Sequence, residues 1–300
     1  MASKDLKRIE RIIEAAINNG VKYLLHIGRV LEKEHLGLLK KFQDKISLSL
    51  IDNGSAVRLL PQIKKLGLFF NEGIDISVDG IKANHEKQRG KGSWQLVLNS
   101  YQLKSIAKGI SFIGATSVLN YKTIVKDFYL SSRKFAWVDK FVISTIYQPH
   151  HRKKRVALNN KEMRYFFKEA LKYSNKFPLT INIFTLKNII PILDLLPKEK
   201  LKTKYISLHW KITQLEVGYF PASITPNEEF PIDCNGRHFI PFGGDYHVNS
   251  RPEKFELRDD LIVKDPDKSY QKIVGKFRRY FGEKFLEEEK KVFGLHFRGI

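Results

Sequence analysis

Residues 74–94, IDISVDGIKANHEKQRGKGSW, combine a short apolar run with a polar, glycine-rich exit and the start of a helix. The alternating apolar residues predict a strand, the pair Asp79-Gly80 predicts a turn, and the glycines after Arg89 predict a loop that ends at a helix cap. In a parallel α/β barrel, the loops at the carboxyl ends of the strands carry the chemistry. We therefore expect Ser77, Asp79 and Arg89 to be candidate ligand contacts, although a Ser-x-Asp-Gly sequence at a strand end is more often only a turn.

A second group of candidate residues lies near the carboxyl terminus. Cys234, His238 and His247 are close in sequence and would converge if residues 233–248 form a hairpin. Thiolate and imidazole groups bind zinc and iron, so these three residues are a candidate metal site. A fourth ligand is not evident, and a buried cysteine with surface histidines explains the same spacing more simply.

Other common reactions lack their usual residues. Paired carboxylates near a strand end, as acid–base catalysis requires, are not evident. The run Gly90-Lys91-Gly92-Ser93 lacks the leading spacing of a phosphate-binding P-loop. The sequence therefore predicts neither acid–base catalysis by paired carboxylates nor nucleoside triphosphate binding.

Strand and helix patterns alternate along the first part of the chain. The predicted strands are residues 23–27, 45–51, 73–78, 110–118 and 138–147, and the predicted helices are residues 4–19, 31–42, 56–66, 93–108, 121–131 and 161–173. Such alternation demands parallel strands joined by right-handed crossovers. Because the pattern begins with a helix, we expect the strand at 23–27 to be an exposed edge.

After residue 173 the pattern changes. The predicted elements are alternating segments at 179–184 and 205–220, a helix at 186–196, a hairpin at 233–248 and a charged amphipathic helix at 269–292. This second part is expected to be an appended unit rather than a continuation of the barrel.

Composition limits the class of protein. The 300 residues are 42% hydrophobic, which is typical of a globular chain, and no run of about 18 apolar residues predicts a membrane span. We expect a cytoplasmic protein without a membrane partner. The formal net charge is +21, which favours polyanions, but the basic residues are spread along the chain. Nucleic-acid binding is therefore kept as an alternative, with its densest cluster at residues 150–155, HHRKKR.

Several segments together resemble the radical SAM superfamily, in particular the peptide- and protein-modifying branch with a SPASM-type extension. The segment ISVDGIKANHEKQRGKGSW is similar to the family's fourth-strand segment, and HIGRVLEKEHLGLLKKF and ISLSLIDNGSAV are similar to two earlier ones. The segment EEFPIDCNGRHFIPFGGDYHVNS, at 228–250, resembles the cysteine-bearing hairpin of the extension. The resemblance implies that Ser77, Asp79, Arg89, Asn53 and Gly28 lie where the family binds S-adenosyl-L-methionine (SAM).

Two departures separate this sequence from active members of the family. The cluster motif C-x3-C-x2-C is absent and the chain contains one cysteine, whereas a four-iron cluster needs several thiolate ligands. The family's Gly-Gly-Glu-Pro loop reads Gly28-Arg29-Val30, which places a cation near the sulfonium of SAM. The chain as given is therefore expected to hold no cofactor, although the family uses SAM and an iron–sulfur cluster.

The resemblance implies an α/β fold, namely an incomplete parallel (β/α) barrel of the radical SAM (TIM-like) type at 1–176 and a SPASM-like extension with a terminal helix at 177–300. The expected role is that of a pseudoenzyme, a noncatalytic binding or accessory protein with a peptide or protein partner. Two alternatives stay open. The chain is part of an active radical SAM enzyme whose cluster segment lies upstream, or it is a basic protein that binds nucleic acid.

Overall fold

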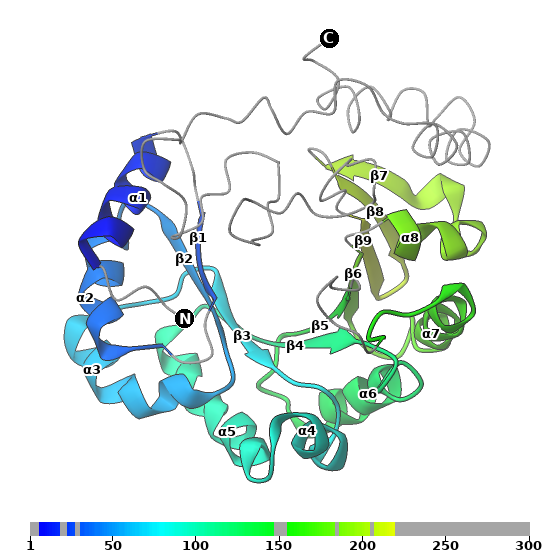
Figure 1. The fold of residues 1–300 in the computed structure, drawn as a ribbon, viewed down its shortest axis with the longest axis horizontal. Coiled ribbons are helices and arrows are strands. Elements are labelled where there is room, and N and C mark those ends of the chain that lie inside the picture. Colours follow the sequence, from blue (N-terminus) through cyan, green and yellow to red (C-terminus); the bar gives the residue numbers. More distant parts are fainter. Residues whose placement is uncertain are drawn as a thin grey trace. The chain divides into compact units, whose positions relative to one another are not determined.

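The computed structural model describes residues 6–18, 23–27, 31–146, 155–183, 186–204 and 207–219. Within these residues the chain forms two compact units (Figure 1). Unit 1 holds the described residues up to Gly114 together with residues 130–141, and unit 2 holds residues 115–129 and those from Val142 onward. The division therefore falls inside a strand, a helix and the next strand of the chain.

Unit 1 is a run of parallel strands and connecting helices. Its elements are α1 (Leu6–Asn18), β1 (Tyr23–Ile27), α2 (Lys33–Phe42), β2 (Ser47–Asp52), the 3₁₀ helix η1 (Ser55–Leu59), α3 (Leu60–Leu66), β3 (Gly73–Ser77), α4 (Lys82–Arg89), α5 (Ser93–Asn99), η2 (Ser100–Ile106) and most of β4 (Ile110–Thr116). The strands lie in the order β1-β2-β3-β4, and each neighbouring pair is parallel. The helices lie along one side of these strands (Figure 1).

The two faces of the unit 1 sheet differ in chemistry because the strand side chains alternate. The face toward the helices is apolar and buried, and it includes Leu48, Leu50, Ile74, Ile76 and Phe112. Phe112 packs in T-shaped contacts against Phe135, Trp137 and Phe141 at centroid distances of 5.4–5.8 Å. The opposite face carries serine and aspartate side chains, and we call it the open face because no helix among the described residues covers it (Figure 1).

Unit 2 combines parallel and antiparallel pairing. Its elements are the first part of α6 (Ile124–Lys134), most of β5 (Lys140–Thr145), α7 (Asn160–Lys172), β6 (Leu179–Ile183), α8 (Leu186–Ile189), the 3₁₀ helices η3 (Ile190–Leu195) and η4 (Lys198–Lys200), β7 (Leu201–Lys204), β8 (Ser207–Ile212) and β9 (Leu215–Tyr219). The strand order is β5-β6-β9-β8-β7, in which β6 and β9 are parallel while β7, β8 and β9 are antiparallel. A capping box between Asn159 and Glu162 begins α7.

The α/β fold of mostly parallel strands that the sequence predicts is confirmed for the described residues. Strand β1 lies at the end of the unit 1 strand order, as expected for an edge, and its Leu25 side chain is exposed. The predicted segment at 205–220 contains the hairpin of β8 and β9, but β7 was not predicted. Strand β6, which the sequence assigned to the extension, neighbours β5 in the sheet, while the division at residue 176 and the SPASM-like character of the second part stay predictions.

Three predicted helices need correction. The helix predicted at 93–108 is α5 followed by the 3₁₀ helix η2, the one at 186–196 is α8 followed by η3, and the one at 56–66 begins as η1. Helix α4 was interpreted as loop because its sequence, KANHEKQR, lacks an apolar stripe and buries only His85. The predicted hairpin at 233–248 and the helix at 269–292 lie outside the described residues.

Candidate functional site

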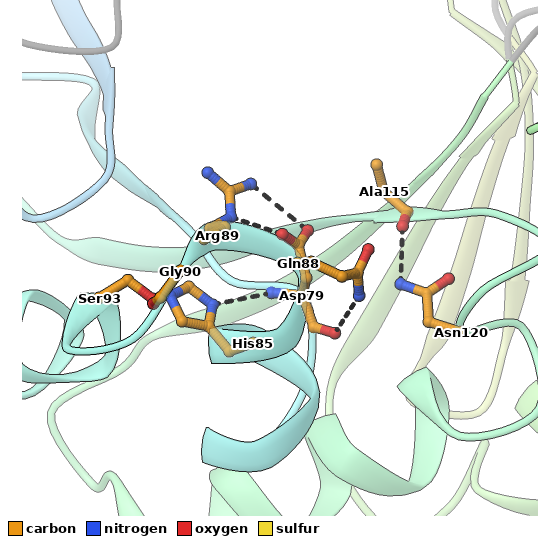
Figure 2. A network of polar contacts seen from close by, with 8 residues as sticks. All are labelled: Asp79, His85, Gln88, Arg89, Gly90, Ser93, Ala115 and Asn120. Carbon is orange, nitrogen blue, oxygen red and sulfur yellow. Dashed lines mark hydrogen bonds and ion pairs between the residues drawn. The ribbon is translucent and has the colours of Figure 1, made fainter.

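The carboxyl end of β3 is tied to α4 through Asp79 (Figure 2). The Asp79 carboxylate accepts hydrogen bonds from Arg89 Nε at 2.5 Å and from Arg89 Nη2 at 3.3 Å. Its carbonyl oxygen accepts from Gln88 Nε2 at 3.3 Å, and its backbone N–H donates to His85 Nδ1 at 3.3 Å. All the polar groups of Asp79 are therefore used to fix the turn against the helix that follows it.

His85 is the buried member of this network. Its ring lies 5.5 Å from the ring of Trp94 in a T-shaped contact, and the residue is 1% exposed. Burial lowers the pKa of His85, and the nearby Asp79 carboxylate opposes that shift. Because Nδ1 accepts the Asp79 N–H, the neutral ring carries its proton on Nε2, and His85 is a positioning group for the turn rather than a cation.

The carboxyl end of β2 is built from its own loop. Asp52 is fully buried, and its carboxylate accepts from Ser55 Oγ at 3.1 Å and from Ala56 N at 3.0 Å. The Asn53 side chain accepts from Ser55 N at 3.0 Å, which is a local Asx turn. Gly54 has φ +94°, and a Cβ there would meet the Leu96 carbonyl oxygen at 2.4 Å. This loop is therefore held closed against α5.

The open face of unit 1 presents a polar patch that we define as Ser49, Asp75, Ser77 and Ser111. These side chains come from β2, β3 and β4, and Asp75 stands opposite Ser111 in the strand register. Asp75 is hydrogen-bonded to Ser111, and all four residues are partly exposed. The polar patch is the part of the described structure with hydroxyl and carboxylate groups on adjacent strands of one face.

The pKa of the Asp75 carboxyl group is raised, as is common for acidic residues in functional sites. Burial raises the pKa of Asp75, while the Ser111 hydroxyl and the positive charge of Lys140 oppose the rise. A carboxyl group with a raised pKa exchanges its proton closer to neutral pH and, when protonated, can donate a hydrogen bond. Asp75 is therefore the titratable group of the patch.

At the end of β4, unit 2 contains a separate turn of its own. Asn120 donates from Nδ2 to the Ala115 carbonyl at 3.0 Å (Figure 2) and accepts from Ser117 N at 2.8 Å. Both bonds satisfy backbone groups where the strand ends and α6 begins. The side chain thus shapes the turn.

The site residues predicted from the sequence lie in different surroundings in the structure. Asp79 and Arg89 are brought together, but with each other as partners, and Asn53 is used within its own loop. Ser77 lies on the open face, within the polar patch. Gly28 and the candidate metal ligands Cys234, His238 and His247 lie outside the described residues, so their roles stay predictions.

Sequence reasoning missed Asp75 and Ser111. The signal was present, because a carboxylate between Ile74 and Ile76 and the alternation of serine with leucine in SLSLID are unusual for parallel strands. Parallel strands covered on both faces read as nearly continuous apolar runs. Alternation on a parallel strand therefore indicates one polar face.

The described residues show neither a metal-binding group nor a membrane span. Within the part of the chain that the structure describes, no three His, Cys, Asp or Glu side chains group in a way that could hold a metal ion. None of the helices in the described ranges is long and apolar enough to cross a membrane.

Comparisons with known proteins give little support for a family. No protein-family model matches the chain, and no curated protein matches it. Among solved structures, the chain is similar to TYW1 with a lysine-pyruvate adduct bound, at 16% identity and a TM-score of 0.37. The match covers 51% of this chain and 51% of that one, so the chain spans about half the length of that relative. A likeness of this size establishes neither a shared fold nor a shared activity.

The residues present do not fit an iron–sulfur cluster. The chain has a single cysteine, Cys234, and a four-iron cluster is held by several thiolates. The positions matched to SAM contacts fit that ligand poorly as well, because the Asp79 carboxylate is occupied by Arg89 and Asn53 by Ser55 N. The four residues of the polar patch are partly exposed, and two of their hydrogen bonds stay within the sheet, from Ser49 to the Gly73 carbonyl oxygen and between Asp75 and Ser111.

Proposed function

We propose that this chain is a radical-SAM-like protein without a cluster, a pseudoenzyme that binds a small polar ligand on the polar patch of unit 1. The observation that carries the proposal is the placement of Asp75, Ser77 and Ser111 on one face of adjacent parallel strands, a face that no helix among the described residues covers. In a complete α/β barrel, bulky apolar side chains fill the interior. Serine and aspartate at these positions supply hydrogen-bonding groups in place of that packing.

The charges around the patch define the kind of ligand. The cation Lys140 acts on Asp75, and the whole chain carries a formal net charge of +21. A ligand with hydroxyl groups and no fixed positive charge satisfies the serine hydroxyls without repulsion from these cations. S-adenosylhomocysteine has a neutral sulfur, whereas the sulfonium of SAM is a fixed cation, so the patch favours the former.

Thermal unfolding of the full chain with each compound tests the proposal. A ligand present at 100 times its Kd adds about 2.7 kcal/mol to the free energy of unfolding. We expect a small rise in Tm with millimolar S-adenosylhomocysteine and none with SAM. The rise should disappear in Asp75→Asn and Ser111→Ala, and it should persist in the matched control Ser105→Ala, whose exposed hydroxyl bonds only within η2.

Other outcomes separate the proposal from its rivals. If neither compound raises Tm, the small-ligand proposal is wrong. A larger shift with SAM than with S-adenosylhomocysteine would favour the second candidate function, in which the chain is one part of an active radical SAM enzyme whose cluster is held by another segment. Anaerobic reconstitution of this chain that yields about four irons per chain would overturn the cluster-free proposal itself.

The noncatalytic role implies a partner that uses the bound ligand or the fold. Strand β1 has no neighbour on its outer side among the described strands, so its backbone groups there can pair with a peptide or protein strand. A peptide or protein partner is therefore part of the proposal, and nucleic acid is not needed for it.

A further inference from the structure

One face of α7 in unit 2 carries a stripe of exposed cations and a tyrosine. Lys161, Tyr165, Lys168 and Lys172 recur at the i, i+4, i+7 and i+11 spacing that lines up one side of a helix. All four are exposed, and Tyr165 is 44% exposed. The opposite side of α7 packs into the core through apolar residues, namely Met163, Phe166, Phe167 and Ala170. The stripe is therefore the solvent side of a well-anchored helix.

Aromatic contacts place the segment that leads into α6 beside this stripe. The rings of Tyr121 and Tyr165 meet in a T-shaped contact at 5.8 Å, and those of Tyr129 and Tyr173 lie 5.1 Å apart. Lys122 lies 5.7 Å from the Tyr121 ring centroid, which adds a cation next to the tyrosine pair. Tyr165 is thus an exposed ring surrounded by lysines from two segments of unit 2.

The negative charges in this region are already compensated. Glu162 accepts two hydrogen bonds from Arg155, at 2.5 and 2.8 Å, and Glu169 pairs with Lys172 at 2.5 Å. Asp127 is buried. Among the described residues, no ion pair is formed by Lys122, Lys126, Lys161, Lys168 or Lys176. We call these five lysines together with Tyr165 the basic face.

We propose that the basic face binds single-stranded nucleic acid. Lysines attract successive phosphates, and an exposed ring among them is a platform on which an unpaired base can stack. An acidic peptide would use the lysines but not the tyrosine. A membrane surface would need a broader apolar area, and Tyr165 and Leu119 are the exposed large apolar side chains among the described residues of unit 2. The inference is independent of the ligand proposed for unit 1, because it rests on other residues and another ligand class.

Fluorescence anisotropy with a labelled 12-nucleotide single strand of mixed sequence tests this inference on the full chain. We expect Lys126, Lys161 and Lys168 changed together to Gln to weaken binding at least tenfold and to reduce the salt slope by about 2, because each phosphate contact on a single strand contributes about 0.7. The matched control changes Lys64, Lys65 and Lys108 to Gln, which removes the same charge from exposed positions of unit 1. This control should lose much less affinity.

The tyrosine provides the second arm of the test. Tyr165→Leu should weaken binding at least about fivefold, because stacking of a base on an aromatic ring is commonly worth that much, and Tyr165→Phe should retain it. Circular dichroism and Tm of each variant confirm that unit 2 is folded. Equal losses in the two lysine triples would show that only the net charge acts, which overturns the inference. No binding at about 0.15 M salt, or binding to vesicles with anionic lipid but not to the oligonucleotide, would overturn it as well.

Discussion

The loops that follow β2 and β3 have similar sequences at their start, but their aspartates form different hydrogen bonds. Each has an aspartate followed closely by glycine, in Asp52-Asn53-Gly54 and in Asp79-Gly80. At the end of β2 the carboxylate bonds within four residues of itself, to Ser55 and Ala56. At the end of β3 the carboxylate reaches ten residues onward, to Arg89 at the end of α4.

The difference follows from what comes next in the chain. After β2 the backbone turns directly into η1, so the Asp52 carboxylate accepts the Ala56 N–H in the first turn of that helix, and Gly54 lets the loop approach the backbone of α5. After β3 the polar helix α4 has one buried side chain, His85, and needs other contacts to hold it. The Asp79–Arg89 pair supplies them at the surface, where Arg89 is 34% exposed. The β2 end is therefore expected to be stiff and costly to change, and the β3 end to be adaptable.

The largest effect is expected at Gly54. Changing Gly54→Ala should lower the free energy of unfolding by at least about 3 kcal/mol, because a Cβ would overlap the Leu96 carbonyl and the positive φ adds strain. Urea unfolding measures the loss. The matched control is Gly92→Ala, which has a similar left-handed backbone, with φ +85°, but no atom within 4 Å of the added Cβ, so it should cost only about 1 kcal/mol. Equal losses would mean that the close approach to α5 does not matter.

The next effect is expected at Asp52. Asp52→Ala should cost about 2–3 kcal/mol, because it leaves the buried Ser55 hydroxyl and Ala56 N–H without their acceptor. Asp52→Asn retains one oxygen for Ala56 N and should cost about half as much. The same unfolding experiment compares them, and an Asn variant as unstable as the Ala variant would show that charge rather than the hydrogen bond holds the loop.

A smaller effect is expected from the pair at the end of β3. In a double-mutant cycle, Asp79→Ala and Arg89→Ala should show a coupling of about 1 kcal/mol, because one partner is a third exposed and solvent screens the pair. The coupling should fall in 1 M salt. A coupling above about 3 kcal/mol, or one that salt does not change, would place this pair with the buried β2 end.

The sequence predicted the strands of these two regions better than the side-chain contacts at their ends. The alternation of Ile74 and Ile76 located β3, and the apolar spacing of the other strands located their partners, because burial of one face fixes the side-chain period. It did not reveal α4, whose polar sequence gives no periodic signal, nor that Arg89 would be used by Asp79. Pairing across ten residues depends on the path of the chain, whereas the Asx turn at Asn53 is local and is already contained in the sequence Asp-Asn-Gly-Ser.

Removing the carboxylate within β3 should stabilise the fold, whereas removing those at the strand ends should destabilise it. Because burial raises the pKa of Asp75 above the ordinary value of 3.8, the folded chain binds its proton more tightly than the unfolded chain does. The unfolding free energy therefore falls as pH rises from about 3.8 through the raised pKa, and the loss is complete above that value. Asp75→Asn removes this loss, so the variant should be more stable than the native chain at pH 7, and the gain should shrink toward pH 4. Ser111→Ala removes a bond to the ionised carboxylate and should instead lower stability at pH 7. Urea unfolding at several pH values measures both variants. A loss of stability in Asp75→Asn at pH 7 would show that the carboxylate supports the fold. Asp75 would then no longer be a residue that is held in place for ligand binding.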